Sequence, residues 1–223
     1  EEADDIQYAK ALGTLSKMLE KYHGHKCIIL IDEYDVPLEN AWFGGFYDQM
    51  IGFIRSLFES ALKTNDALEF AVITGCLRIS RESIFTGLNN LKINSVLRAS
   101  YGDAFGFTET EVKDMLNYYG LDDKFAEIKR WYDGYHFGNK EIYNPWSIIN
   151  YVDDMNRDPE MIPCAYWSNT SSNSIIRELV EEADEETRGE IEQLIAGETL
   201  EKPIHEDITY GDIHESKDNL WNF

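Results

Sequence analysis

The chain has 223 residues, of which 43% are apolar and 13% aromatic, so it can bury a sizeable core and is not a disordered protein. Its 42 acidic and 20 basic residues give a formal net charge of -22, which repels phosphate backbones and anionic lipid. We therefore expect neither direct nucleic-acid binding by this segment nor a membrane partner. Three widely spaced cysteines and the lack of a long apolar run predict a soluble, cytoplasmic protein.

The chain opens with a helix and a strand. Apolar residues four and three positions apart predict an amphipathic helix that Gly24 ends, with the stripe Tyr8, Leu12, Leu15, Leu19 and Tyr22. Residues 26–31 follow as a strand. Because its apolar run is continuous, both faces of this strand are expected to be covered, as in a parallel sheet between helices.

A second helix and a second strand come next. We predict a loop that holds Pro37, a core-facing helix over residues 46–62 and a strand over residues 68–74. The order helix, strand, helix, strand is typical of a crossover unit with parallel strands. The predicted fold class of residues 1–103 is therefore α/β.

The pattern then becomes mainly helical. Thr108 and Glu111 form a capping box that opens a helix ending at Gly120, and another helix follows from residue 123 to residue 131. Together with the elements below, this pattern predicts a mainly helical, lid-like domain over residues 104–197.

A turn and further helices complete the prediction. Gly138 and Asn139 predict a short hairpin, and Asn144 with Pro145 starts a helix as cap and first-turn proline. Residues 172–196 read as helical and acidic, with a break at Gly189, and residues 198–223 as a loose tail.

Three carboxylates follow the first strand directly, in the stretch KCIILIDEYDVPLEN. Ligands bind at the carboxyl ends of strands in open α/β sheets, so Asp32 and Glu33 are expected to face a crevice. One acid can hold magnesium while its neighbour polarises a water for attack on a phosphoryl group. An ordinary polar turn, with Asp35 and Pro37 as turn residues, explains the same pattern equally well.

Five segments in order resemble one family, the AAA-ATPase-like proteins of the P-loop NTPase superfamily, which are often fused to a PD-(D/E)XK nuclease-like domain. The segments are CIILIDEYDVPL, which resembles a Walker B strand, ITGCLRISRESIFTGLNNL, FGFTETEV, WYDGYHFGNKEIYNPWS and YWSNTSSNSII. The resemblance implies a partial ASCE-type parallel sheet followed by a lid-like region. It also implies magnesium-dependent ATP binding and hydrolysis by the complete protein.

The resemblance implies roles for individual residues. Asp32 would be the magnesium-associated acid and Glu33 the residue that activates water. Thr74, at the end of the second strand, would sit where such folds place a γ-phosphate sensor. Arg78 is a candidate sensor or arginine finger, although an arginine in so acidic a protein more often pairs with a carboxylate. Arg81 is a weaker candidate of the same kind.

The sequence contains no P-loop of the form G-x-x-x-x-G-K-[ST]. In the family this loop lies upstream of the Walker B strand, so we expect a fragment that neither binds ATP tightly nor hydrolyses it alone. Mg²⁺ and ATP are thus expected as cofactor and ligand of the complete protein. The alternative function is a nucleotide-independent binding or regulatory module that serves a partner or a nuclease-like domain.

The missing loop also affects the expected sheet. In ASCE-type NTPases the P-loop strand lies between the two strands identified here, so either these strands pair directly or another chain fills the gap. An open strand edge favours a homo-oligomer or a rearranged core.

The aromatic-rich stretch RWYDGYHFGNKEIYNPW has two interpretations. Its rings could stack on a nucleic-acid base or form a packed corner, and we assign them to packing: Trp131, Tyr135, Phe137, Tyr143 and Trp146.

Overall fold

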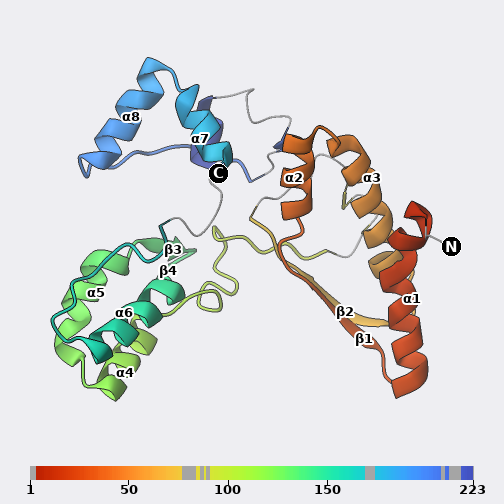
Figure 1. Ribbon diagram of the computed structural model, residues 1–223, viewed down its shortest axis with the longest axis horizontal. Helices are drawn as coiled ribbons and strands as arrows, with labels where there is room; N and C mark the ends of the chain where they lie inside the picture. The colour runs from red at the N-terminus through yellow and green to blue at the C-terminus, as the bar shows by residue number, and fades with distance from the viewer. Residues whose placement is uncertain are drawn as a thin grey trace. The chain divides into compact units, whose positions relative to one another are not determined.

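The computed structural model describes residues 4–76, 84–85, 88, 91–168, 174–206, 209–210 and 217–222. The fold is mixed α/β and forms two compact units (Figure 1). Unit 1 comprises Glu1–Leu91 and Asn173–Phe223, and unit 2 comprises Lys92–Ser172. These boundaries differ from the ones expected at residues 104 and 198, and the expected division stays a prediction. Within the described ranges, no helix combines the length and apolar character needed to cross a membrane.

Unit 1 combines helices with a parallel pair of strands. Its elements are α1 (Asp5–His23), β1 (Cys27–Ile31), α2 (Val36–Gly44), α3 (Tyr47–Phe58), the π-helix η1 (Glu59–Lys63), β2 (Leu68–Ile73), α7 (Ser174–Glu181), α8 (Glu185–Ile195) and the 3-10 helix η4 (Lys217–Asn222). The two predicted strands and the helix that begins the chain are confirmed. The left-handed Gly24 ends α1 as expected, with φ 72°.

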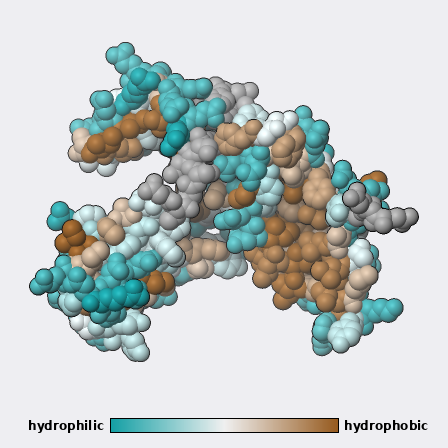
Figure 2. Space-filling model, in the orientation of Figure 1, coloured by the Kyte–Doolittle hydropathy of each residue, from teal (hydrophilic) through white to brown (hydrophobic). Residues whose placement is uncertain are grey.

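Strands β1 and β2 pair directly and in parallel, which confirms the first of the two arrangements expected from the sequence. Ile28 lies beside Phe70 and Leu30 beside Val72 on the outer face. All four side chains are exposed, Leu30 by 74% and Phe70 by 60%. Figure 2 shows the resulting apolar surface over these strands. The expectation that both faces of the first strand are covered is therefore wrong for the part of the chain described here.

Helix α1 packs through its small residues rather than through its apolar stripe. Ala9, Gly13 and Ser16 are buried, whereas Tyr22 is 83% exposed and Leu15 51%. A side chain at Gly13 would place its Cβ 2.8 Å from the carbonyl oxygen of Ser60 in η1, so glycine permits the close approach. The predicted helix is correct, but the stripe mostly faces away from the core.

The segment after β1 is helical where a loop was expected. Pro37 lies in the first turn of α2, where its missing N–H costs nothing, and Gly45 ends the helix with φ 75°. The core of this unit joins Tyr34 and α2 to α3 and to a residue far along the chain, Tyr210: its buried members are Tyr34, Leu38, Ile51, Ile54, Phe58, Ile84 and Tyr210. The Tyr210 ring lies 5.5 Å from that of Tyr47, centroid to centroid. The tail is thus packed at this point rather than loose.

The acidic region near the C-terminus contains two helices, but its break was placed wrongly. Gly189 lies inside α8, and the chain is interrupted earlier, before Asp184. The Asp184 carboxylate accepts a hydrogen bond from the Thr187 N–H at 2.8 Å and caps α8. A good N-cap at this position decides where the helix starts, whereas one interior glycine costs only about 1 kcal/mol.

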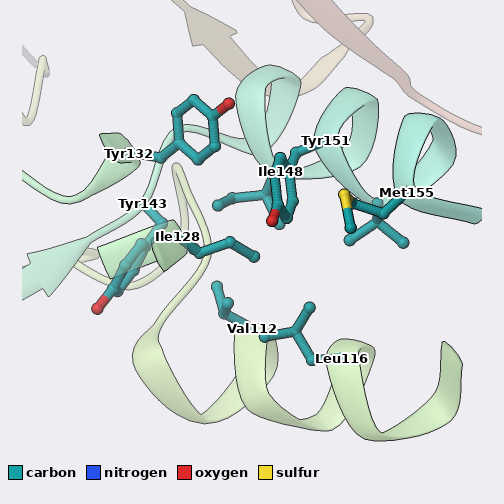
Figure 3. Close-up of a cluster of buried hydrophobic side chains, with 9 residues drawn as sticks. Val112, Leu116, Ile128, Tyr132, Tyr143, Ile148, Tyr151 and Met155 are labelled. Atoms are coloured by element: carbon teal, nitrogen blue, oxygen red, sulfur yellow. The ribbon is translucent and has the colours of Figure 1, made fainter. Parts of the chain in front are cut away.

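Unit 2 is a helical layer with one hairpin: α4 (Glu109–Tyr119), the 3-10 helix η2 (Asp122–Lys124), α5 (Phe125–Tyr132), β3 (Tyr135–Phe137), β4 (Lys140–Ile142) and α6 (Pro145–Arg157). The predicted capping box at Thr108, the hairpin turn at Gly138 and the Asn144 cap are confirmed. Side chains from α4, α5 and α6 meet in a buried core, drawn in Figure 3. Each fully buried Ile or Leu there contributes about 1.5–3 kcal/mol through removal from water.

Candidate functional site

The candidate site lies where β1 and β2 end side by side. Asp32 and Glu33 directly follow β1, and Thr74 directly follows β2. The two strands are parallel, and Ile31 at the end of β1 lies opposite Ile73 at the end of β2. The carboxyl ends of the strands therefore meet at one edge of the sheet. Three of the predicted site residues are therefore neighbours, although 41 positions of sequence separate Glu33 from Thr74.

Hydrogen bonds tie the two strand ends together. The Thr74 hydroxyl donates to Oδ1 of Asp32. The same hydroxyl oxygen accepts the Glu33 N–H at 3.3 Å. The backbone adds two bonds, from the Thr74 N–H to the Ile31 carbonyl at 2.9 Å and from the Tyr34 N–H to the Thr74 carbonyl at 3.0 Å. Thr74 is thus bonded to all four of the residues that end β1 and begin the turn after it.

Glu33 has an unusual backbone conformation. Its φ is 51°, in the left-handed region that residues other than Gly, Asn and Asp seldom adopt. Such a residue costs on the order of 1–3 kcal/mol and persists only where its surroundings hold it. Here its N–H is bonded to the Thr74 hydroxyl oxygen, and its carbonyl accepts the Val36 N–H at 3.1 Å. The Glu33 and Asp32 side chains are both exposed to solvent.

The oxygen atoms at the strand ends can provide only part of the coordination shell of a magnesium ion. Asp32 and Thr74 supply one carboxylate and one hydroxyl, which are hard ligands. No group of three or more His, Cys, Asp or Glu side chains suited to a metal ion occurs among the residues that the structure describes. Magnesium commonly takes one or two protein carboxylates together with water and substrate phosphates. The pair therefore fits a magnesium ion that arrives with phosphate, and does not fit one caged by protein alone.

A third carboxylate lies beneath the site, and sequence reasoning missed its role. Asp35 is 4% exposed, and its Oδ2 accepts the Cys76 N–H at 2.9 Å. The sequence interpretation treated Asp35 as an ordinary turn residue. The sequence places Asp35 two positions beyond Glu33, but this spacing alone does not show that its side chain turns back under the two surface acids.

The surroundings of Asp35 are apolar and negatively charged. Burial, followed by the charge of Asp35, raises the pKa of the Glu39 carboxyl in α2. The same two causes raise the pKa of the Cys76 thiol, so it is a weaker nucleophile than an ordinary cysteine at neutral pH. Burial also raises the pKa of the Tyr210 hydroxyl, with Asp35 as the next contribution. The packed core under the strand ends thus joins the turn after β1 to Tyr210 in the distant tail.

The two candidate arginines cannot be placed. Arg78 and Arg81 lie outside the described residues, so their predicted role as phosphate sensor or arginine finger stays a prediction.

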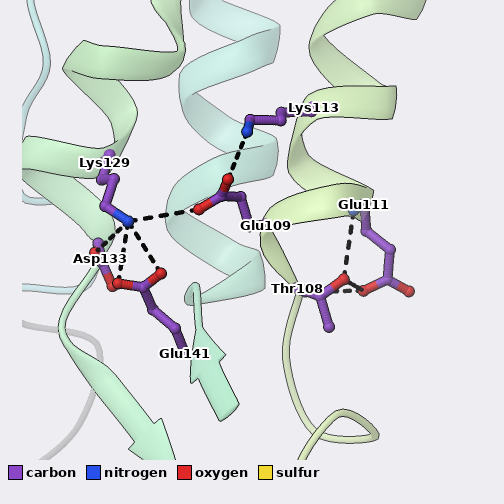
Figure 4. Close-up of polar contacts among 7 residues, drawn as sticks. All are labelled: Thr108, Glu109, Glu111, Lys113, Lys129, Asp133 and Glu141. Atoms are coloured by element: carbon purple, nitrogen blue, oxygen red, sulfur yellow. Dashed lines mark hydrogen bonds and ion pairs between the residues drawn. The ribbon is translucent and has the colours of Figure 1, made fainter.

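A second polar cluster lies in unit 2, around Lys129 of α5 (Figure 4). Its Nζ is 3.0 Å from Glu141, 3.5 Å from Glu109 and 3.7 Å from Asp133. The hydrogen bond to Lys129 lowers the pKa of Glu141, while burial raises the pKa of Asp133. Because the ammonium group already occupies the space among the carboxylates, the cluster holds the hairpin against α4 and α5 and is structural.

The aromatic stretch of unit 2 is only partly buried. Tyr143 is fully buried, but Trp131, Tyr135 and Trp146 are each about half exposed. The exposed Trp146 is anchored by a bond from its indole N–H to the Tyr166 carbonyl at 3.2 Å. The assignment of these residues to packing therefore holds for Tyr143 and is incomplete for the others.

Two comparisons with known proteins found similar sequences. Residues 1–85 match a family model described as "Predicted AAA-ATPase", as the resemblance led us to expect. A curated relative from Azotobacter chroococcum mcd 1, described as an uncharacterized protein in the vnfD 5'region, is 31% identical over 192 residues. The match covers 84% of this chain and 35% of the length of that relative. No solved structure shows a significant match.

Proposed function

With residues 1–85 assigned to the predicted AAA-ATPase family, we propose that the chain is a segment of a magnesium-dependent ATPase. In this proposal the complete protein adopts a P-loop NTPase fold, and β1 is its Walker B strand. The segment supplies the acids and the hydroxyl at the strand ends, and other parts of the complete protein supply the loop that cradles the phosphates. ATP is the small-molecule ligand, and the compartment is the cytoplasm.

The proposal gives each strand-end residue a chemical task. Asp32 would hold the metal, usually through water, and Thr74 would bond to the terminal phosphate. Glu33 would accept a proton from the attacking water, for which a carboxylate beside the metal-associated acid is suited. When bound, Mg²⁺ would neutralise the charge that develops on the phosphoryl oxygens. Arg78 remains a proposed sensor that would stabilise the same charge.

One observation carries this function: the hydrogen bond between the Thr74 hydroxyl and the Asp32 carboxylate. Two parallel strands present an acid and a hydroxyl at one edge, with a second acid beside them. In this proposal the arrangement would supply two of the oxygen ligands and the general base that phosphoryl transfer to water uses. A purely structural turn needs neither the paired acids nor the strained Glu33 backbone.

The test is Glu33→Gln in the complete gene product. Glutamine keeps the size of the side chain but cannot take up a proton, so we expect ATP affinity to be retained and turnover to fall by at least a hundredfold. Steady-state phosphate release and equilibrium nucleotide binding measure the two effects. Glu69→Gln, at an exposed position of β2, is the matched control. Unchanged turnover in Glu33→Gln removes this residue from the mechanism.

The segment alone should be inactive. Without a P-loop it lacks the backbone N–H groups and lysine that bind phosphates, so we expect no heat of binding for Mg-ATP at micromolar concentrations. A micromolar dissociation constant in calorimetric titration would refute this.

A binding or regulatory module is the second candidate, and one observation favours it. The outer face of β1 and β2 exposes apolar side chains that a soluble surface seldom groups together. The sequence of the complete gene product separates the candidates. A glycine-rich loop ending in Lys-Ser or Lys-Thr supports the ATPase, and its absence supports the module.

A further inference from the structure

We propose that Asp35 is a positioning residue, which holds the end of β2 against the turn after β1 and so keeps Thr74 in contact with Asp32. This inference rests on the proposed function only where it concerns ATP hydrolysis. The geometry it explains is independent of nucleotide.

The first support is the bond that Asp35 makes across the site. Its Oδ2 lies 2.9 Å from the backbone nitrogen of Cys76, 41 positions along the chain. A hydrogen bond from an N–H to a carboxylate is roughly twice as strong as one between neutral groups. Asp35 is buried, so water cannot replace this bond without opening the turn.

The second support is the absence of a side chain at Gly75. A Cβ there would lie 2.6 Å from Cδ1 of Tyr34 and 2.8 Å from Oδ1 of Asp35. Both distances are far below van der Waals contact. The backbone of residue 75 therefore lies flush against the turn, and any larger residue would push it away from Asp35.

The third support is the place of this bond in the chain. Thr74 and Cys76 flank Gly75, and Asp32 and Asp35 span a single turn after β1. The bonds of Thr74 to this turn and the bond of Cys76 to Asp35 therefore attach residues 74–76 to the turn at both ends. Without the bond between Asp35 and Cys76, only the hydrogen bonds of Thr74 would hold residues 74–76 against the turn. We therefore expect these residues to move away from Asp32 more often.

The chemistry of the position separates this role from general stability. Asn keeps a carbonyl oxygen that can accept the Cys76 N–H but carries no charge, whereas Ala has no acceptor. The backbone N–H of Cys76 needs an acceptor oxygen and not a charge. Loss of the charge alone should therefore be tolerated, and loss of the acceptor should not.

The test compares Asp35→Asn with Asp35→Ala in the 223-residue chain by amide hydrogen exchange. In Asp35→Ala we expect exchange to speed up at least tenfold at Cys76, and also at Glu33 and Tyr34, whose N–H groups bond to Thr74. In Asp35→Asn all three should exchange near wild-type rates. Amides of α3 report global unfolding, so the acceleration at the three site amides in Asp35→Ala should exceed any change measured in α3.

Other results would overturn the proposal. Equal exchange in the two variants would do so, and so would faster exchange confined to Cys76. If Asp35→Ala does not fold, Gly75→Ala provides the second variant, because its new methyl group displaces residues 74–76 while Asp35 stays intact. It should speed exchange at Glu33 and Tyr34, whereas wild-type rates there would contradict the inference. Gly52→Ala, where a Cβ meets no atom within 4 Å, is its control.

Turnover of the complete gene product keeps this proposal distinct from the proposed function. If ATP is hydrolysed, Asp35→Ala should lower kcat, whereas Asp35→Asn should keep kcat near the wild-type value. If no hydrolysis occurs but the exchange pattern holds, only the proposed function fails. If hydrolysis occurs and Asp35→Ala leaves it unchanged, only the positioning role fails.

Discussion

Three acids separated by at most one residue have different surroundings at the exit of β1. Asp32 and Glu33 are exposed and bonded to Thr74, whereas Asp35 is buried and bonded to Cys76. A carboxylate in water retains its hydration, so the first two are available to a ligand. A buried carboxylate needs a hydrogen-bond donor to offset its lost hydration. Residue type alone therefore did not separate the two exposed acids from the buried one.

Tyr132 provides a test of a buried polar residue in unit 2. Its hydroxyl donates to the Cys164 carbonyl at 3.0 Å and accepts the Cys164 N–H at 3.2 Å. We expect Tyr132→Phe to lower the free energy of unfolding by about 1–3 kcal/mol, because the Cys164 N–H loses this acceptor and the Cys164 carbonyl keeps only its bond from the Tyr166 N–H. Urea denaturation measures the change. Tyr135→Phe, in a half-exposed tyrosine, is the control and should change stability little.

The same residue predicts a pH dependence. Burial raises the pKa of Tyr132 from 10.0 to about 12. Between these values the native state keeps a proton that the unfolded chain has lost, so stability should fall as pH rises from 10 towards 12. Unfolding free energies measured across that range should fall less steeply in Tyr132→Phe than in the wild type. Equal slopes would show that Tyr132 does not contribute.

At the scale of single elements, local sequence signals acted as expected where both partners of a contact are close in sequence. The Thr108 hydroxyl accepts the Glu111 N–H at 3.4 Å, and Glu111 accepts the Thr108 N–H at 2.8 Å, so both halves of the capping box form. The hairpin turn and the Asn144 cap are further cases. Helix α2 was missed because Pro37 was taken as a loop signal, although a proline also fits the first turn of a helix.

The capping box predicts the effect of one substitution. We expect Thr108→Ala to destabilise unit 2 by about 0.5–2 kcal/mol, since the first turn of α4 loses its side-chain acceptor. Thermal or urea unfolding followed by circular dichroism would measure the loss. Thr110→Ala replaces an exposed threonine two positions further along the same helix and should have little effect or be mildly stabilising.

At the scale of the whole molecule, apolar surface remains uncovered in unit 1. The outer face of the β1–β2 pair exposes Ile28, Leu30, Phe70 and Val72, and much of the α1 stripe is exposed as well. Parallel sheets are normally covered on both faces. An open apolar face and open strand edges favour association with another copy or another chain. A homo-oligomer thus remains our proposal for this segment.

The exposed face predicts a concentration-dependent mass. We expect the wild-type chain to self-associate in sedimentation experiments, and Leu30→Lys to shift it towards the monomer by placing a charge in the contact. Ile162→Lys introduces the same charge at a 76% exposed position of unit 2 and should leave the association unchanged. A wild-type chain that stays monomeric at high concentration would contradict this.

The sequence by itself determined most of the helices, the strands, the caps and the hairpin, because these depend on spacings of two to four residues and on residues at the element ends, but it did not determine α2 or the start of α8. It also marked Asp32 and Glu33 at the end of a strand, and the family resemblance added Thr74. Only the tertiary structure decided which faces are buried. The apolar stripe of α1 faces solvent while its small residues pack, and Asp35 finds its donor in Cys76. Tyr210 packs in the same core as Phe58, although more than 150 positions of sequence separate the two residues. Burial depends on neighbours distant in sequence, and no local pattern specifies them.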